Sequence, residues 1–295
     1  MTILVTGGSG QLALAFDAAA AASGRSVTRV GRPGFDFDRP ASIDDAFAAA
    51  APSLVVNAAA YTAVDAAEDD ADSAYRANRD GPAALARLCA GAGIPLIHVS
   101  TDYVFDGTKG TPYVETDPTA PTGVYGASKL AGEQAVLAAC PRAIVLRTSW
   151  VYSPTGKNFV RTMLGAARKT DRLRVVADQT GCPTTAADLA DAILAIAARL
   201  GSEGWHDRYA GVFHAAGTGF TTWHGLAIAA LEEATRHGRP MPTVEPIATA
   251  DWPTRARRPA DSRLDCGKLG AVFGVALPPW RGSLARTVDA IIAAG

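Results

Sequence analysis

The apolar residues of this chain gather in short runs, and most of these runs end in small or polar residues. Five runs have strand length and lie at residues 3–5, 26–30, 54–57, 95–99 and 143–146. Stretches of helical length, many rich in alanine, separate them. Strands that alternate with helices in this way predict an α/β fold with a doubly wound parallel sheet.

After residue 150 the pattern loosens. It predicts helices at 158–169, 186–200, 221–237 and from about 281, a strand at 211–215 and a loop at 178–184. We expect residues 1–150 to form a nucleotide-binding domain that residues 186–215 rejoin. Residues 151–185 and 216–295 are then expected to form a smaller substrate-binding region.

The first turn has the spacing of a dinucleotide site. Gly7-x-x-Gly10-x-x-Ala13 follows the first strand and opens a helix that runs to about residue 22. Gly7 permits a tight turn, and Gly10 lets the backbone approach a pyrophosphate at the helix N-terminus. An ordinary glycine loop is the alternative, but the strand–turn–helix context favours a Rossmann-like nucleotide site.

The residues after the second strand bear on the choice of cofactor. An NAD site usually has an acidic residue there to bind the ribose 2′-OH, whereas this chain has Arg32. A guanidinium suits a 2′-phosphate, so we expect NADPH, with NADH possible; alternatively, Arg32 points into solvent. Asp36 and Phe37 are expected beside the adenine.

Two polar residues further along the chain have expected roles of their own. Asn78 could hold a proton-relay water or cap a helix, and His98 is expected to be a satisfied core residue.

The chemistry of the chain centres on Thr101, Tyr125 and Lys129. Thr101 follows the fourth apolar run, and the Tyr-x-x-x-Lys spacing places the other two side chains on one face of a helix. A free phenol has a pKa near ~10, which a neighbouring ammonium would lower. Tyr125 could then protonate a developing alkoxide while Thr101 holds the same oxygen.

Composition narrows the range of functions. The chain has 295 residues, a net charge of −1 and 48% hydrophobic residues, which gives no reason to expect nucleic acid or a membrane as a partner. We find neither a bilayer-length apolar run nor a signal peptide. The four cysteines form no C-x-x-C pair and the five histidines have no metal-ligand spacing, so we expect a reduced, cytoplasmic protein without a metal site.

Taken together and in order, these motifs resemble the extended short-chain dehydrogenases/reductases and, among them, the dTDP-4-dehydrorhamnose reductase family. The matching segments span nearly the whole chain and lie at residues 7–12, 57–65, 100–107, 125–133, 147–150, 156–159, 178–184 and 258–264. The resemblance implies NADPH-dependent reduction of the C4 keto group of dTDP-4-dehydro-β-L-rhamnose to dTDP-L-rhamnose. Its implied partner is a nucleotide sugar.

The resemblance also implies roles for individual residues. For the cofactor they are Gly10, Gln11 and Leu12 at the phosphates, Asp36 and Phe37 at the adenine, Ala59, Ala60 and Tyr61 along the ribose, and Tyr125 and Lys129 at the nicotinamide ribose. For the substrate they are Thr101 and Asp102 at the sugar, with Trp150 and Arg258. Physically, Trp150 offers an apolar face to a deoxysugar, and Arg258 suits a diphosphate. Core packing and a surface position are the respective alternatives.

Two departures from the family pattern matter. Some members bind magnesium through glutamates at a dimer interface, and the aligned position here is Ala15, so we doubt a metal-bridged dimer and expect a monomer or homodimer. No acidic residue follows the second strand at once, which again favours NADPH.

The alternatives to this reductase function are a 4-ketoreductase for another nucleotide deoxysugar, an epimerase that retains NAD, and a non-catalytic NADP-binding regulatory subunit of methionine adenosyltransferase.

Overall fold

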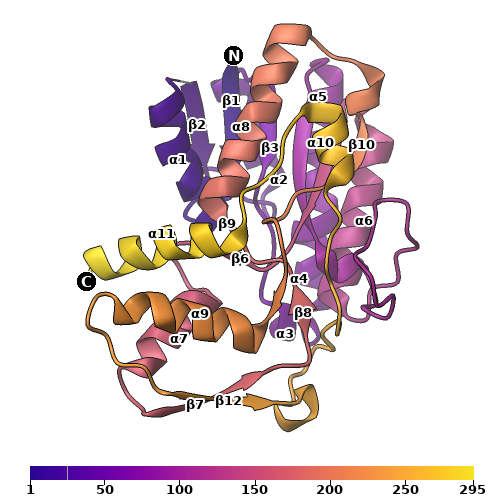
Figure 1. The fold of residues 1–295 in the computed structure, drawn as a ribbon. Helices are drawn as coiled ribbons and strands as arrows, with labels where there is room; N and C mark the ends of the chain where they lie inside the picture. Colours follow the sequence, from indigo (N-terminus) through magenta and orange to yellow (C-terminus); the bar gives the residue numbers. More distant parts are fainter. Residues whose placement is uncertain (25) are drawn as a thin grey trace.

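The computed structural model describes residues 1–24 and 26–295. Its centre is a six-stranded parallel sheet in the order β10-β5-β4-β3-β1-β2 (Figure 1). The strands of this sheet are β1 (Thr2–Thr6), β2 (Ser26–Val30), β3 (Leu54–Asn57), β4 (Leu96–Thr101), β5 (Ala143–Thr148) and β10 (Gly211–His214). The expected α/β doubly wound parallel sheet is therefore confirmed.

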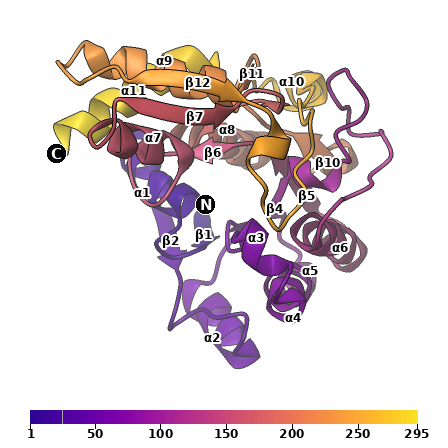
Figure 2. The same cartoon turned by 90° about the horizontal axis from the view of Figure 1, so that it is seen from below.

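Helices cover both faces of the sheet (Figure 2). The helices of the first half are α1 (Gln11–Ser23), α2 (Pro40–Ala50), α3 (Val64–Ala67), α4 (Ala71–Tyr75), the π-helical turn η1 (Arg76–Asp80), α5 (Gly81–Gly91), the 3₁₀ turn η2 (Asp102–Val104) and α6 (Val124–Ala139). Those of the second half are α7 (Phe159–Ala167), α8 (Ala186–Glu203), the 3₁₀ turn η3 (Asp207–Tyr209), α9 (Trp223–Thr235), the 3₁₀ turn η4 (Thr249–Asp251), α10 (Gly267–Phe273) and α11 (Trp280–Ala293).

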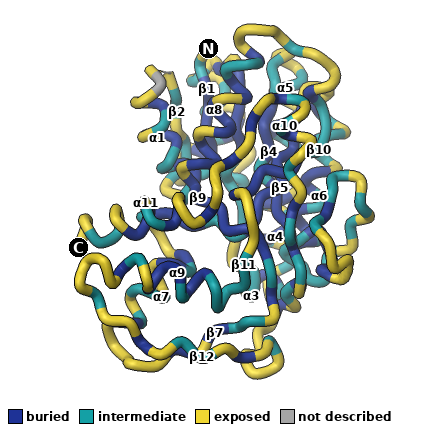
Figure 3. The backbone as a smooth tube through the Cα atoms, viewed as in Figure 1, coloured by how far each residue is buried: buried dark blue, intermediate teal, exposed yellow. Residues whose placement is uncertain are grey.

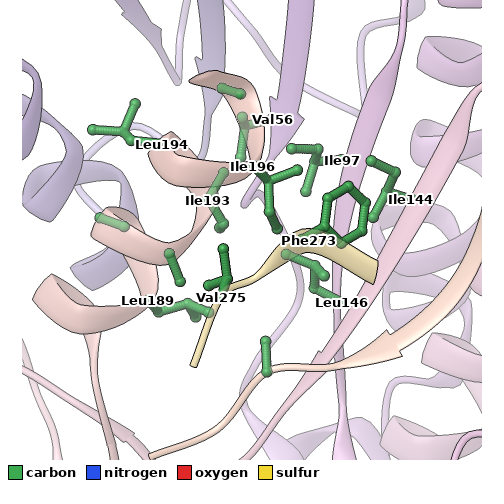
Figure 4. Close-up of a cluster of buried hydrophobic side chains, with 14 of the residues drawn as sticks. Val56, Ile97, Ile144, Leu146, Leu189, Ile193, Leu194, Ile196, Phe273 and Val275 are labelled. Carbon is green, nitrogen blue, oxygen red and sulfur yellow. The ribbon is translucent and has the colours of Figure 1, made fainter. Parts of the chain in front are cut away.

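Alternation along the strands produces two apolar cores. Successive side chains of a strand point to opposite faces, so Ile3 and Val5 join the core under α1, α8 and α10, whereas Leu4 joins the core under α2, α5 and α6. Figure 4 shows part of the first core, where Phe273 of α10 lies among side chains of the central strands. Because both faces are covered, the strands consist of nearly continuous apolar runs.

The strand order reverses between β1 and β3, and this point is where ligands bind in open α/β sheets. The loops that follow these two strands touch: a Cβ on Gly7 would lie 2.9 Å from the Ala58 carbonyl oxygen. Gly7 has a φ of +110°, which a residue with a side chain rarely adopts. The loop after β2 also lies against the loop after β1, because a Cβ on Gly31 would lie 2.3 Å from the Gly8 Cα.

The rest of the chain forms a smaller layer below the sheet, as Figure 1 is drawn. It holds three two-stranded pairs formed by β7 (Arg172–Val176) with β12 (Thr243–Ile247), β6 (Val151–Tyr152) with β9 (Thr184–Thr185), and β8 (Thr180–Gly181) with β11 (Thr221–Thr222). Helices α7, α9 and α11 pack around Tyr152, Leu226 and Trp280. Figure 3 shows that exposed backbone is common around β7 and β12, whereas the strands of the large sheet are mostly buried.

The second half differs from the sequence expectation in several places. The expected loop at 178–184 contains β8 and the start of β9, and the β7–β12 pair and α10 were not predicted. Strand β10 pairs with β5, and α8 packs in the core of the large sheet. Helix α10 packs in this core too, although it belongs to the stretch assigned to the smaller region. The division into two regions stays a prediction.

Candidate functional site

The glycine loop leaves the N-terminus of α1 free for an anion. Gly10 is the N-cap, its amide donates to the Gly7 carbonyl at 2.8 Å, and no side chain caps the helix. The two residues that follow Gly10 offer a ligand mainly their backbone N–H groups. Leu12 is 8% exposed and packs in the core, and the Gln11 side-chain oxygen accepts from Ser153 at 3.0 Å and Asn158 at 2.9 Å. A pyrophosphate therefore fits against main-chain N–H groups here.

Arg32 lies on the surface, as the alternative interpretation expected, but two carboxylates hold it. Its guanidinium pairs with Asp36 at 3.1 Å and with Asp38 at 3.0 Å, and its side chain is 68% exposed. Phe37 packs against the first turn of α5, where a Cβ on Gly81 would lie 2.2 Å from the aromatic ring. These residues form one exposed edge next to the loop after β2.

Buried amides fix the loop that follows β3. Asn57 accepts from Thr6 at 2.6 Å and from the Ala59 amide at 3.2 Å. Asn78 accepts from the Tyr61 amide at 2.8 Å and donates to the Tyr61 carbonyl at 3.2 Å. The helix-cap expectation for Asn78 is wrong, because the residue lies within η1 and its side-chain amide clamps this backbone, whereas a relay water at Asn78 stays a prediction. The backbone of residues 59–61 is therefore preorganised for a ligand.

Thr101, Tyr125 and Lys129 come together between β4 and α6. Tyr125 and Lys129 share one helix face, and the Lys129 ammonium donates to the Val99 carbonyl at 2.7 Å. The ring of Tyr103 meets that of Tyr125 edge-on, with centroids 5.6 Å apart. Lys129 is 2% exposed, so this ammonium is almost fully removed from water.

The pKa of Tyr125 corrects one expectation. Burial raises this pKa above its ordinary value, and a hydrogen bond with Thr101 opposes the rise only in part. The predicted lowering by Lys129 is wrong in direction, because removal from water outweighs other influences and the ammonium is bonded to the Val99 carbonyl. Burial also lowers the pKa of Lys129 to about 8. Tyr125 is consequently a neutral phenol at pH 7, which suits a proton donor.

Asp102 lies behind Thr101 with 2% of its surface exposed. Its carboxylate accepts from the Thr101 hydroxyl at 3.1 Å and from Ser149 at 3.0 Å. Burial raises its pKa to about 6, against the hydrogen bonds from Ser262, Ser149 and Thr101. Asp102 therefore contacts Thr101 from within the protein and helps to orient its hydroxyl.

Trp150 adopts an unusual backbone conformation for a large side chain, with a φ of +48°. Its ring stacks on Trp223 at a centroid distance of 3.6 Å and an angle of 7°. The other close neighbour is Gly181, where a Cβ would lie 2.4 Å from the Trp150 ring. The ring is half-buried, so the core-packing alternative describes part of it, and its role toward a sugar stays a prediction.

Arg258 joins the C-terminal segment to the catalytic region. It donates to Asp65 at 2.8 Å and to the Tyr103 hydroxyl at 3.1 Å. Sequence reasoning missed both partners, although Asp65 closes the motif at 57–65 and Tyr103 belongs to the motif at 100–107. A guanidinium held on two sides has its remaining N–H groups preoriented for an anion such as a diphosphate.

His98 is a core residue, as expected, but only one ring nitrogen is satisfied. Its Nδ1 lies 2.9 Å from the Asn57 side-chain amide, and its buried Nε2 has no partner in the described part of the chain. Burial and the Lys129 charge lower its pKa well below the ordinary value. His98 is therefore neutral at pH 7.

Within residues 1–24 and 26–295, no group of three His, Cys, Asp or Glu side chains is placed to hold a metal ion. In the same ranges, no helix has both the length and the apolar character needed to cross a membrane. All four cysteines are free thiols.

The parallel sheet, the nucleotide loop at its switch point and the Thr101–Tyr125–Lys129 set define an oxidoreductase of the extended short-chain dehydrogenase/reductase class. The sequence model of the family described as "RmlD substrate binding domain" matches residues 1–292, and the chain belongs to this family.

Known proteins agree with this assignment. A dTDP-4-dehydrorhamnose reductase of Sinorhizobium fredii is 48% identical over 298 residues, covering 100% of this chain and 99% of that protein. The crystal structure of a dTDP-4-dehydrorhamnose reductase from Clostridium acetobutylicum superposes with a TM-score of 0.89 at 34% identity, covering 98% of this chain and 99% of the other. That of the Bacillus anthracis enzyme in complex with NADP gives 0.88 at 30% identity, covering 98% of each chain.

Proposed function

We propose that this protein catalyses the reaction of the dTDP-4-dehydrorhamnose reductases, the NADPH-dependent reduction of the C4 keto group of dTDP-4-dehydro-β-L-rhamnose to dTDP-L-rhamnose. The observation that carries the proposal is the full-length 48% identity to a reductase of this name, combined with Tyr125 beside the buried Thr101 and Lys129. The NADP complex of the Bacillus anthracis relative supports the choice of cofactor.

The reaction follows from what these side chains can do. NADPH, when bound, supplies the hydride. The Tyr125 phenol, kept protonated by burial, gives its proton to the C4 oxygen as negative charge develops there. Lys129 holds the nicotinamide ribose, and Thr101, fixed by Asp102, orients Tyr125 and the sugar oxygen. Arg258 binds the diphosphate and Trp150 contacts the deoxysugar.

Two further parts of the proposal concern organisation and location. Residues 1–150 with 186–215 hold the cofactor, and 151–185 with 216–295 hold the nucleotide sugar. The protein works in the cytoplasm, which the four free thiols support.

The test is an NADPH-consumption assay with enzymatically prepared dTDP-4-dehydro-β-L-rhamnose. Tyr125→Phe should bind NADPH nearly as well as the wild type but lose turnover by roughly 10³-fold, because the ring stays and the acid is gone. Turnover close to that of the wild type in this variant would rule out the assigned role of Tyr125. Other dTDP-4-keto-6-deoxyhexoses, assayed in parallel, test the choice of sugar.

A further inference from the structure

A third ionisable side chain shares the face of α6 that carries Tyr125 and Lys129. Glu133 follows Lys129 by four residues, as Lys129 follows Tyr125, so the three lie in one row. The row faces the last three residues of β4. Tyr125 interacts with Thr101, Lys129 donates to the Val99 carbonyl at 2.7 Å, and Glu133 accepts from the Ser100 hydroxyl at 2.6 Å.

A fully buried arginine holds the Glu133 carboxylate. Arg147 of β5 donates from Nε at 2.9 Å and from Nη2 at 2.7 Å, a two-point contact. Glu133 is 2% exposed and Arg147 4%, and the guanidinium lies 5.1 Å from the centre of the Phe105 ring. A carboxylate that accepts hydrogen bonds from a guanidinium and a hydroxyl is stabilised in its charged form. A fixed negative charge therefore lies one helical turn from Lys129.

Burial opposes the Lys129 charge, whereas the Val99 carbonyl and the Glu133 carboxylate favour it. Burial lowers the Lys129 pKa to about 8, and the Glu133 charge raises it. The other titratable residues on the elements packed against α6 are His98 on β4, Arg147 on β5, Asp102 and Tyr103 on η2, Asp65 on α3 with Glu68 at its end, Asp72 and Tyr75 on α4, Arg76, Arg79 and Asp80 on η1, and Arg87 and Cys89 on α5. Of these, His98 is kept neutral and Glu68 accepts from the Val124 amide at the far end of the helix.

We propose that Glu133, held by Arg147, is a positioning residue that keeps the Lys129 ammonium charged and directed along the Val99 carbonyl during catalysis. The inference rests on the reductase function proposed above. Glu133 touches neither substrate nor cofactor, and acts only through Lys129 and through the spacing between α6 and β4.

The first test is Glu133→Gln, which keeps the length of the side chain and an oxygen for Ser100 but removes the charge. The ammonium loses its carboxylate, so the alkaline limb of the pH profile for kcat/KM should move to lower pH by about one unit. At pH 8 the KM for NADPH should rise by about five-fold, while the KM for the keto-sugar stays within about two-fold. An unchanged alkaline limb would overturn the inference.

Two further variants separate positioning from stability. Glu133→Gln leaves the Arg147 charge buried and unpaired, which costs stability. Glu133→Gln/Arg147→Met removes both charges and should recover much of the lost melting temperature. The alkaline limb of its pH profile should stay at the lower pH seen for Glu133→Gln. Glu133→Asp retains the charge and should restore the wild-type limb. A purely structural role predicts instead that melting temperatures change in all three variants and pH profiles in none.

A matched control and a binding measurement complete the design. Glu245→Gln breaks the exposed ion pair with Arg172, at 3.0 Å, and should change neither the pH profile nor the KM for NADPH. NADPH affinity measured by fluorescence against pH needs no keto-sugar. A shifted affinity profile with no turnover on any keto-sugar supports the inference and refutes the proposed function. Normal turnover with no shift refutes the inference alone.

Discussion

The two ends of the proposed cofactor site use positive charge in opposite ways. At the adenosine end, Arg32 is 68% exposed and shares two surface carboxylates. At the nicotinamide end, Lys129 is 2% exposed and bonded to a backbone carbonyl. Both charges are proposed to contact the same cofactor, but only Lys129 lies in a region where water is excluded.

This difference separates recognition from chemistry. An exposed ion pair contributes roughly 0–1 kcal/mol, and salt screens it, so Arg32 can exchange its carboxylates for a phosphate at little cost. A buried ammonium has a shifted pKa and depends on every neighbouring charge. We therefore expect substitutions at the nicotinamide end to have large effects and those at the adenosine end to have small ones.

The largest effect on stability in this comparison is expected from Gly132→Ala in α6. A Cβ at this position would lie 1.9 Å from the Asn78 carbonyl oxygen, so α6 would have to move away from η1. The expected cost is about 3 kcal/mol in the free energy of unfolding, measured by urea denaturation. Gly165→Ala in α7 is the matched control: nothing lies within 4 Å of the new Cβ, and a gain of roughly 0.5–1 kcal/mol is expected. Equal responses of the two variants would contradict tight packing around the nicotinamide end.

A smaller effect, visible as a pH dependence, is expected from Asp102→Asn. The folded-state pKa of Asp102 is raised to about 6 from an ordinary 3.8, so its stabilising contribution is present below pH 3.8 and lost as the pH rises through 6. The variant loses this titration. Its free energy of unfolding relative to the wild type should rise by about 2 kcal/mol between pH 4 and pH 7. A difference that does not vary with pH would show that Asp102 does not titrate in this window.

The smallest effect is expected from Arg32→Ala at the adenosine end. Removing one exposed guanidinium should weaken NADPH binding by about five-fold and leave NADH binding unchanged. Titration at two salt concentrations checks the cause, because the loss should shrink at high ionic strength. Arg172→Ala removes another exposed arginine and serves as the control. If the variant lost affinity equally for NADPH and NADH, this would contradict the proposed contact between Arg32 and the 2′-phosphate.

The sequence predicted the large sheet better than the smaller layer. Strands β1, β3, β4 and β5 are mostly apolar because both faces of the sheet are covered, and such runs can be recognised locally, whereas the edge strand β2 contains Thr28 and Arg29. Strand β7 instead pairs with β12, which lies about 70 residues further along the chain, and Arg172 and Arg174 interrupt its apolar pattern. Local periodicity contains no information about so distant a partner.

The same limit applies to the site. Spacing alone placed Tyr125 and Lys129 on one face of a helix, and the structure agrees. The direction of the Tyr125 pKa depends first on how far the phenol is removed from water and then on the nearby Asp102 charge, and both are decided by the tertiary fold. The Arg258–Asp65 contact joins residues from opposite ends of the chain and could not be read from either segment.

The late arrival of β10 and α10 has a consequence for synthesis. Until residues 211–214 leave the ribosome, β5 is an unpaired edge, and until α8 and, later, α10 have left it, one face of the sheet lacks part of its cover. Such intermediates expose strand edges and apolar surface to other chains. A nascent chain that stalls near residue 150 is therefore a target for chaperones rather than a working nucleotide-binding fragment.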